Sequence, residues 1–153
     1  MNFSPFVSAN KIIFLFVFSI LFIPSGLFAQ NDARDFHYWF DKGALLSVYG
    51  NQKAAIQAFQ KAIELEPRNS AAYFNMSIAF AENGDFHEAI EAVNMAISLN
   101  PGSALYQYGK GWIYIRFGDK IQGVFEMRKA AEMNSEDAKR FLQSIASRQT
   151  GRQ

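Results

Sequence analysis

Three consecutive copies of a 34-residue pattern occupy residues 36–137. Small residues and large apolar residues recur in fixed columns of this pattern. The small columns are Gly43, Ser77 and Gly111; Gly50, Gly84 and Gly118; Ala55, Ala89 and Gly123; and Ala62, Ala96 and Ala130. The large columns are Leu46, Phe80 and Tyr114, and Phe59, Val93 and Met127. A constant period of this length indicates stacked copies of one supersecondary unit, because a single copy cannot bury its apolar face alone.

Each copy is predicted to form two helices. In the second copy, apolar residues at helical spacing predict a helix from Ser70 to Asn83, and Gly84 suits a left-handed C-terminal cap. Asp85 is expected to cap the next helix, with Glu88 completing a capping box. That helix should end near Leu99, because a proline follows Asn100. The small columns have a packing role, since they allow the two helices to approach closely.

These columns resemble the tetratricopeptide repeat family, whose pattern combines aromatic, small and proline positions. The first copy carries Trp39, Gly43, Ala55, Phe59 and Pro67, and the second carries Tyr73, Ser77, Phe80, Ala89 and Pro101. The third copy departs from the pattern at Gln107, Gly123, Met127 and Ser135. The resemblance implies an all-α solenoid of three stacked helix-turn-helix repeats, at residues 36–69, 70–103 and 104–137. Helical hairpins of another solenoid type are the alternative.

A further helix is predicted at residues 136–148. Ala138, Phe141, Leu142 and Ile145 fall on one side of it, and charged residues cover the other side. Ser135 is expected to be its N-cap. A repeat array needs such a polar-backed helix to end in water, so we expect this one to cap the solenoid. Residues 149–153 are expected to form a frayed tail.

Residues 1–29 are typical of a secretory signal peptide. Lys11 precedes an uncharged apolar run at residues 12–23, Pro24 breaks any helix, and Ala29 offers a small residue at a cleavage site. Residues 30–35 are then a short linker. The apolar run is shorter than the roughly 20 residues of a spanning helix, although an uncleaved N-terminal anchor, or less readily a buried core helix, is an alternative. We therefore expect an exported protein of a periplasm or cell envelope, or a secreted one, which contacts a membrane only if the segment is retained.

Composition argues against several classes of function. Fifteen basic and 14 acidic residues leave a net charge of +1, which does not favour nucleic acid as a partner. The absence of cysteine excludes disulfides, zinc–thiolate sites and cysteine nucleophiles. His87 and Glu88 begin like a zinc-protease motif, but the second histidine is missing. We find no catalytic constellation, and we expect no cofactor, no metal site and no enzymatic activity.

The family resemblance implies that the first helix of each repeat lines a concave groove that binds a partner. The groove residues expected on this basis are His37, Phe40, Phe74, Asn75, Ile78, Leu105, Tyr108 and Trp112. Such a groove is apolar and aromatic, and it suits a partner's helix or extended segment. Alternatively, the same aromatic residues form core contacts between successive helices.

A chaperone-binding branch of the family binds a C-terminal carboxylate with Lys, Asn and Arg. Only Asn75 matches that set here, so we predict no carboxylate clamp.

Two functions follow as hypotheses. The first is an exported, non-catalytic interaction module, an adapter that docks an apolar or aromatic segment of another protein. The second is a structural subunit of a cell-envelope assembly that associates with copies of itself, for which the motivation is the excess of aromatic residues in only three repeats.

Overall fold

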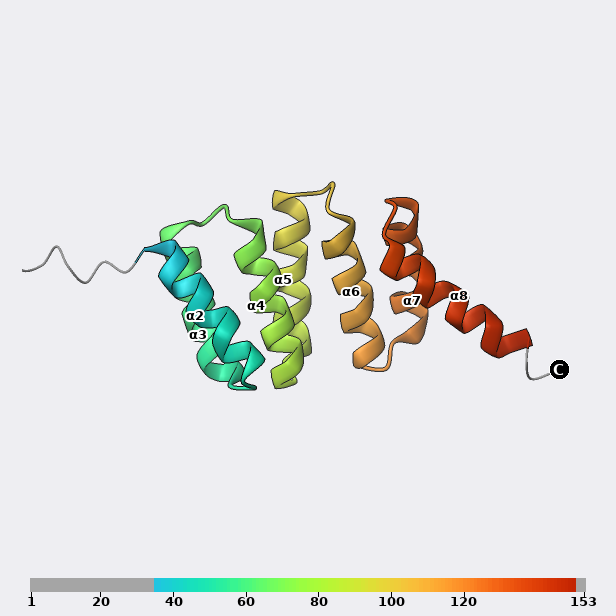
Figure 1. Ribbon diagram of the computed structural model, residues 1–153, viewed down its shortest axis with the longest axis horizontal. Coiled ribbons are helices and arrows are strands. Elements are labelled where there is room, and N and C mark those ends of the chain that lie inside the picture. The colour runs from blue at the N-terminus through green and yellow to red at the C-terminus, as the bar shows by residue number, and fades with distance from the viewer. Residues whose placement is uncertain (1–34, 151–153) are drawn as a thin grey trace, which may run out of the picture. The chain divides into compact units, whose positions relative to one another are not determined.

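The computed structural model describes residues 35–150, and every regular element in this range is an α-helix (Figure 1). Three hairpins follow one another: α2 (Phe36–Val48) with α3 (Gln52–Leu65), α4 (Ser70–Asn83) with α5 (Phe86–Leu99), and α6 (Ala104–Arg116) with α7 (Lys120–Glu132). The last helix is α8 (Glu136–Thr150). The predicted all-α repeat solenoid is thus confirmed. The predicted export segment 1–29, residues 30–34 of the linker and residues 151–153 lie outside the described residues.

Glycine closes the first helix of every hairpin. Gly50, Gly84 and Gly118 have φ angles of +79°, +98° and +92°. A Cβ atom is strained in this left-handed conformation, which glycine adopts without cost, so the 34-residue recurrence of glycine has a backbone reason. Between α7 and α8, Asn134 adopts the same left-handed conformation, with a φ angle of 66°. Asparagine tolerates this conformation better than most residues.

Side-chain caps begin most of the helices, with one exception to our expectation. The N-cap side chains of α2, α3, α4, α6 and α7 each accept a backbone N–H bond, and these residues are Asp35, Asn51, Asn69, Ser103 and Asp119. Asp85 makes no such bond at the start of α5, so the predicted capping box with Glu88 is wrong. The Asn83 side-chain amide instead donates a hydrogen bond to the Asp85 carboxylate at 2.6 Å. This carboxylate is therefore bound to a side chain and not to a backbone N–H of α5.

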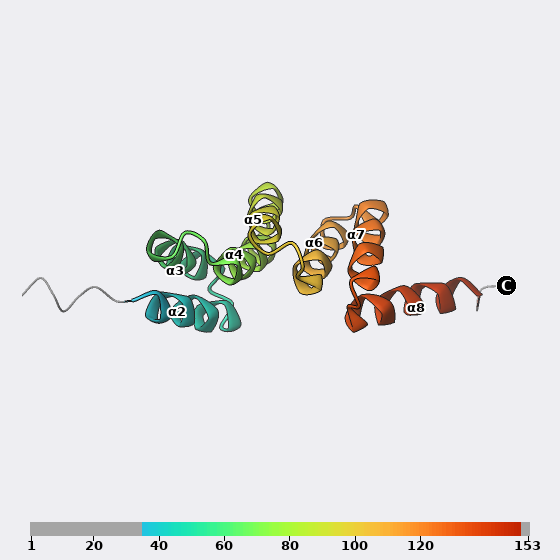
Figure 2. The same cartoon turned by 90° about the horizontal axis from the view of Figure 1, so that it is seen from above.

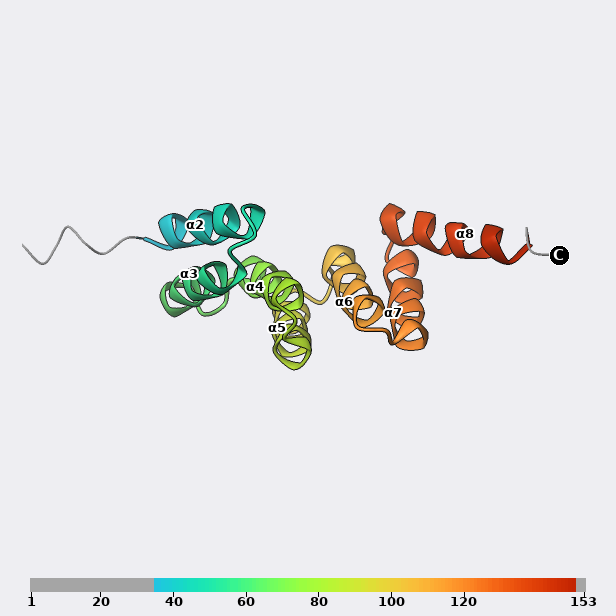
Figure 3. The same ribbon diagram turned by 90° about the horizontal axis from the view of Figure 1, so that it is seen from below.

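Figure 2 and Figure 3 show the two helices of each hairpin side by side, from opposite directions. The helices meet at small residues. Ala55 and Ala62 in α3 and Ala89 and Ala96 in α5 are fully buried. A Cβ atom added to Gly43 would lie 2.7 Å from the Phe59 ring. The large columns then fill the space around these crossings: Phe59, Val93 and Met127 are each at most 1% exposed. The periodic columns are therefore the packing surfaces of the hairpins.

The third hairpin has a close approach between the backbones of its two helices. Gly111 in α6 faces Gly123 in α7, and a Cβ atom added to Gly123 would lie 2.9 Å from the Gly111 carbonyl oxygen. In the first two repeats the position of Gly123 is alanine. A Cβ atom on Gly123 would also collide with the Ile115 side chain, whose column holds the smaller Ser47 and Ala81 in the first two repeats. Glycine therefore replaces alanine in the third copy, because both the Gly111 backbone and Ile115 lie close to it.

Helix α8 packs on α7 through its first turns. The Ser135 hydroxyl accepts a bond from the Ala138 N–H at 3.3 Å, and Ala138, Phe141 and Leu142 pack around Met127 and Ala130. The helix continues two residues beyond the predicted end at 148, since neither glycine nor proline occurs before Gly151. Farther along, α8 leaves an open cleft of about 620 Å³ against α7.

Within residues 35–150, no helix has both the length and the apolar character that crossing a bilayer requires.

We predict that Gly123→Ala lowers the free energy of unfolding by about 1–3 kcal/mol, because the added methyl overpacks a contact with backbone. Alanine's higher helix propensity, about 1 kcal/mol, acts in the opposite direction and does not offset this loss. Chemical denaturation followed by circular dichroism measures the difference. Gly102→Ala is the matched control, because an added Cβ there meets no atom closer than 3.9 Å. Equal stability of Gly123→Ala and wild type would contradict the packing argument.

Candidate functional site

The first helices of the second and third repeats lie side by side and are joined at both ends. At one end, the Ser70 and Tyr106 hydroxyls are 3.2 Å apart. At the other end, Arg116 Nε donates to the Ala81 carbonyl oxygen at 3.1 Å, and the Arg116 guanidinium pairs with the Glu82 carboxylate at 2.9 Å. These contacts fix α6 against α4, so that the surface between the two helices has a defined shape.

A shallow groove of about 260 Å³ lies on this surface, and we call it the α4–α6 groove. Its walls are mostly apolar and aromatic. The lining residues are Phe74, Ile78 and Glu82 from α4, and Leu105, Tyr108, Gly109 and Trp112 from α6. The volume falls below the roughly 300–1,000 Å³ of small-molecule sites. A groove of this size suits one large side chain of a partner rather than an enclosed ligand.

The groove's floor depends on Gly109. The Phe74 ring stacks on the Tyr106 ring with centroids 4.8 Å apart. This position brings Phe74 so close to α6 that a Cβ atom on Gly109 would collide with its ring. Phe74 is therefore both a core contact between helices and part of the groove surface. On sequence alone, a core contact and a groove residue were alternatives, and Phe74 is both.

Charges lie only at one end of the groove. Glu82 and Arg116 pair with each other there, and the Arg116 guanidinium also lies 5.5 Å from the centre of the Trp112 ring. No basic residue lines the groove itself. The surface is thus electrically balanced and apolar, and it offers a partner dispersion and burial rather than an ion pair.

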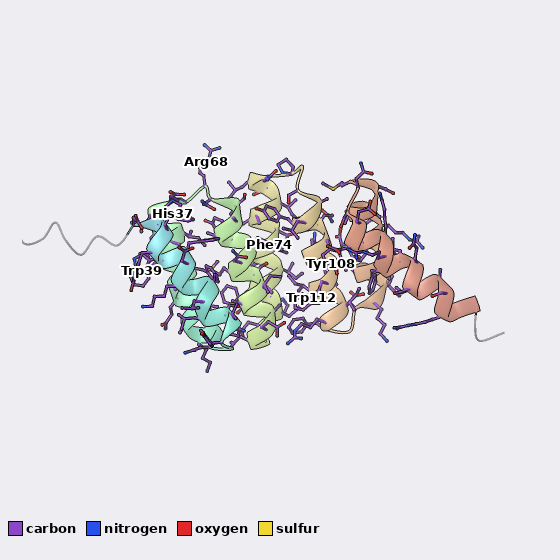
Figure 4. All side chains as sticks on the ribbon, in the orientation of Figure 1. His37, Trp39, Arg68, Phe74, Tyr108 and Trp112 are labelled. Atoms are coloured by element: carbon purple, nitrogen blue, oxygen red, sulfur yellow. The ribbon has the colours of Figure 1, made fainter. Side chains whose placement is uncertain are left out.

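Five of the eight groove residues predicted from sequence line this one groove: Phe74, Ile78, Leu105, Tyr108 and Trp112. Figure 4 shows Phe74 on α4 near Tyr108 and Trp112 on α6, with His37 apart from them on α2.

The other three predicted residues lie elsewhere. Phe40 packs into the core of the first hairpin, with its ring 5.3 Å from Phe36 and 5.9 Å from Phe59. His37 is exposed and touches Phe36 edge-on, and Asn75 is half-buried on α4 outside the groove lining. The row of first helices therefore does not form one continuous aromatic surface, since the Phe40 ring of α2 packs within its own hairpin.

Sequence reasoning missed Glu82 in the lining, as well as Tyr106 and Arg116 in the frame. Gly109 lies in a column of the first helices that holds Asp41 and Asn75 in the other repeats. A glycine that replaces a polar residue in mid-helix often marks a close approach. The contacts of Arg116 span about one repeat, and no local pattern predicts them.

A second cluster surrounds Glu126 in α7, which is 2% exposed. Its carboxylate accepts a hydrogen bond from the Gln107 amide, another from Gln122 at 3.1 Å, and lies 3.3 Å from the amino groups of Lys110 and Lys129. The carboxylate is fully partnered, so it has the environment of a structural ion cluster rather than of a catalytic base.

The repeat columns explain this cluster. In the first two repeats an aromatic residue, Trp39 or Tyr73, lies beside an alanine, Ala58 or Ala92. In the third repeat the same two columns hold Gln107 and Glu126. A polar pair thus replaces an apolar pair, and both partners change together.

Two pKa values depart from their ordinary range. Burial raises the pKa of Tyr114, and the nearby carboxylates of Glu126 and Asp119 raise it further. The pKa of Glu136 is lowered, mainly by the hydrogen bond from Lys139. Glu136 is fully exposed and Tyr114 lies outside the α4–α6 groove, so neither shift indicates acid–base chemistry there. Within residues 35–150, no cluster of three or more histidines or carboxylates is arranged to hold a metal ion.

We predict that Glu126→Ala and Gln107→Tyr are each destabilising, and that the double variant is more stable than the sum of the two losses implies. Glu126→Ala leaves the half-buried Lys110 without a carboxylate partner, which lowers the free energy of unfolding by about 3 kcal/mol. The double variant recreates the aromatic–alanine pair of the other repeats. A double-mutant cycle in urea measures the coupling. Strictly additive losses would show that the two columns do not depend on each other.

Comparisons with known proteins agree with this architecture. Two family profiles described as tetratricopeptide repeat match residues 49–113 and residues 104–137. A TPR repeat-containing protein of Methanocaldococcus jannaschii is 35% identical over 51 residues, which are 33% of this chain and 9% of that protein.

Solved structures show the same fold. A crystal structure of MamA is similar with a TM-score of 0.62 and 28% identity, over 71% of this chain and 63% of that chain. The first TPR of Spaghetti (RPAP3), bound to the HSP90 peptide SRMEEVD, has a TM-score of 0.65 at 19% identity, over 78% of this chain and 96% of that one. The Sgt2 TPR domain from Aspergillus fumigatus reaches 0.66 at 18% identity, over 74% and 78%. The chain spans less than two thirds of the MamA chain that it matches. With their repeat columns, their helical hairpins and both profile matches, residues 49–137 of this chain are tetratricopeptide repeats.

Proposed function

We propose that the chain is an exported, non-catalytic interaction module that binds an apolar or aromatic segment of a partner protein in the α4–α6 groove. The observation that carries the proposal is the convergence of Phe74, Tyr108 and Trp112 on one exposed surface. Aromatic side chains held by a rigid frame supply much of the energy in protein interfaces. The solved TPR domain with a bound HSP90 peptide supports a role in protein binding for this fold.

The groove favours an apolar partner over an acidic C-terminus. The positions that correspond to the carboxylate clamp hold Phe40, Ala44, Asn75, Leu105 and Gly109. None is a cation, and Arg116 at the groove's end is already paired with Glu82. A partner's carboxylate would lose its hydration there without gaining a counter-charge, so burial of one would be unfavourable.

We predict that peptides selected for binding to the chain carry a bulky apolar side chain, and that Leu105→Glu weakens them about tenfold or more. Leu105 is 55% exposed, so glutamate at this position places a charge in the groove without disturbing the core. Fluorescence anisotropy measures the dissociation constants. Leu65→Glu is the matched control, because Leu65 is similarly exposed at the end of α3, outside the groove. Equal weakening by both variants, or preference for acidic C-terminal peptides, would argue against this site.

We further propose that residues 1–29 direct export to a periplasm or cell envelope and are then removed. Intact mass spectrometry of the exported chain should show the loss of these residues after Ala29. Replacing Ala29 with Tyr should preserve the segment, because a large residue at this position blocks cleavage. A full-length mass in the soluble periplasmic fraction would contradict removal, and a full-length mass in the membrane fraction would instead favour a retained anchor.

A further inference from the structure

The outer face of α7 differs from the corresponding helix of each other repeat. Ile121 is 88% exposed and Phe125 is 51% exposed. The same columns hold Lys53 and Gln57 in α3 and His87 and Glu91 in α5. The repeat fold therefore does not require apolar residues here, because two of its three copies place polar groups at both positions. Their exposure indicates a function other than packing within the chain.

Cations surround this apolar face. Lys120 and Arg128 line it together with Ile121, Val124 and Phe125, and we call this set the basic ridge. Lys129 adds a third cation, with its amino group 4.5 Å from the centre of the Phe125 ring. Neither Lys120 nor Arg128 forms an ion pair with any residue that the structure describes. Two positive charges thus remain available beside exposed apolar side chains.

The second hairpin carries a surface of the opposite charge. A groove of about 300 Å³ between α4 and α5 is lined by apolar residues and two carboxylates, and we call it the acidic groove. Its residues are Tyr73, Met76, Phe80, Glu88, Glu91, Ala92 and Met95. Met95 is 45% exposed. Within residues 35–150, Glu88 and Glu91 are not part of an ion pair either.

Only the second repeat offers this combination. The corresponding surface of the first repeat contains Lys42 and Lys61 beside Glu64, so its charges are mixed. In the third repeat the corresponding columns hold Gln107, Lys110 and Glu126, whose side chains bond to one another. A ridge with two cations and apolar side chains therefore matches one groove of the chain, which has two carboxylates and a flexible, polarisable methionine at its edge.

We propose that the basic ridge of one copy docks in the acidic groove of a second copy. The two surfaces lie on different hairpins, so one such contact leaves the groove of the first copy and the ridge of the second available for further copies. Such a contact produces either a closed ring or an open chain of copies. The acidic groove uses a different face of α4 from the α4–α6 groove, since Tyr73, Met76 and Phe80 alternate along the helix with Phe74, Ile78 and Glu82. Self-association and partner binding are therefore independent.

Site-directed crosslinking of the full chain tests this contact, because the chain has no cysteine of its own. One copy carries Met95→Cys in the groove, and a differently tagged copy carries Phe125→Cys on the ridge. We expect a short thiol crosslinker to join these two copies, and to join neither variant efficiently to itself. Val48→Cys, at a strongly exposed position outside both surfaces, is the control for random collision. Heteropair yields no higher than those of either self-pair or of the control would overturn the proposal.

Charge reversal supplies a second readout. The copy with Met95→Cys can also carry Glu88→Lys and Glu91→Lys, and the copy with Phe125→Cys can carry Lys120→Glu and Arg128→Glu. Either charge reversal alone should lower the crosslinking yield about tenfold, because like charges then face each other. Combining both reversed copies should restore the yield. All four side chains are exposed, so loss of folding does not explain a drop, and circular dichroism verifies this. Two outcomes would refute the proposal that a second copy occupies the acidic groove. In one, the combined reversal does not restore the crosslinking yield. In the other, an acidic segment of another protein protects the ridge while the chain stays monomeric.

Discussion

Close contact between the two helices of each hairpin is the constraint on which the rest of the structure depends. The small columns set the distance between the helices, and the large columns fill the space around each crossing. Gly43 receives the Phe59 ring, and Gly111 meets the backbone beside Gly123. Because the crossings recur at a fixed period, successive hairpins stack through similar surfaces. Two columns change together in the third repeat, where Gln107 and Glu126 replace an aromatic residue and an alanine.

The α4–α6 groove is a consequence of this stacking combined with one local departure from it. Stacking places the first helices of neighbouring repeats side by side, and Arg116 and Ser70 fix their ends. Gly109 then removes the side chain that would separate Phe74 from α6. An aromatic residue that would otherwise serve only the core becomes part of an exposed surface. In the first hairpin no such glycine faces Phe40, whose ring is instead packed against Phe36 and Phe59.

The three repeats share a backbone and differ in the chemistry of their outer faces. The first has mixed charges, the second has carboxylates beside methionines, and the third exposes Ile121 and Phe125 among cations. Since packing does not determine the residues on these faces, they are free to carry function. A repeat array separates the two requirements well, because the buried columns maintain the fold while the exposed columns change.

The sequence alone determined the helical hairpins, and the ends of the helices that it bounded to within a few residues, because period, glycine and proline are local signals that survive without a structure. The five groove residues were expected from the resemblance to the tetratricopeptide repeat family. It did not predict that the Asn83 amide binds the Asp85 carboxylate, that the Phe40 ring packs against Phe59, or that Glu82 and Arg116 pair at one end of the groove. Each of these depends on how particular side chains meet in three dimensions, and Glu82 and Arg116 meet although they lie one repeat apart in the chain. Periodicity shows which residues share a column, and only the tertiary structure decided which columns touch and which remain open to a partner.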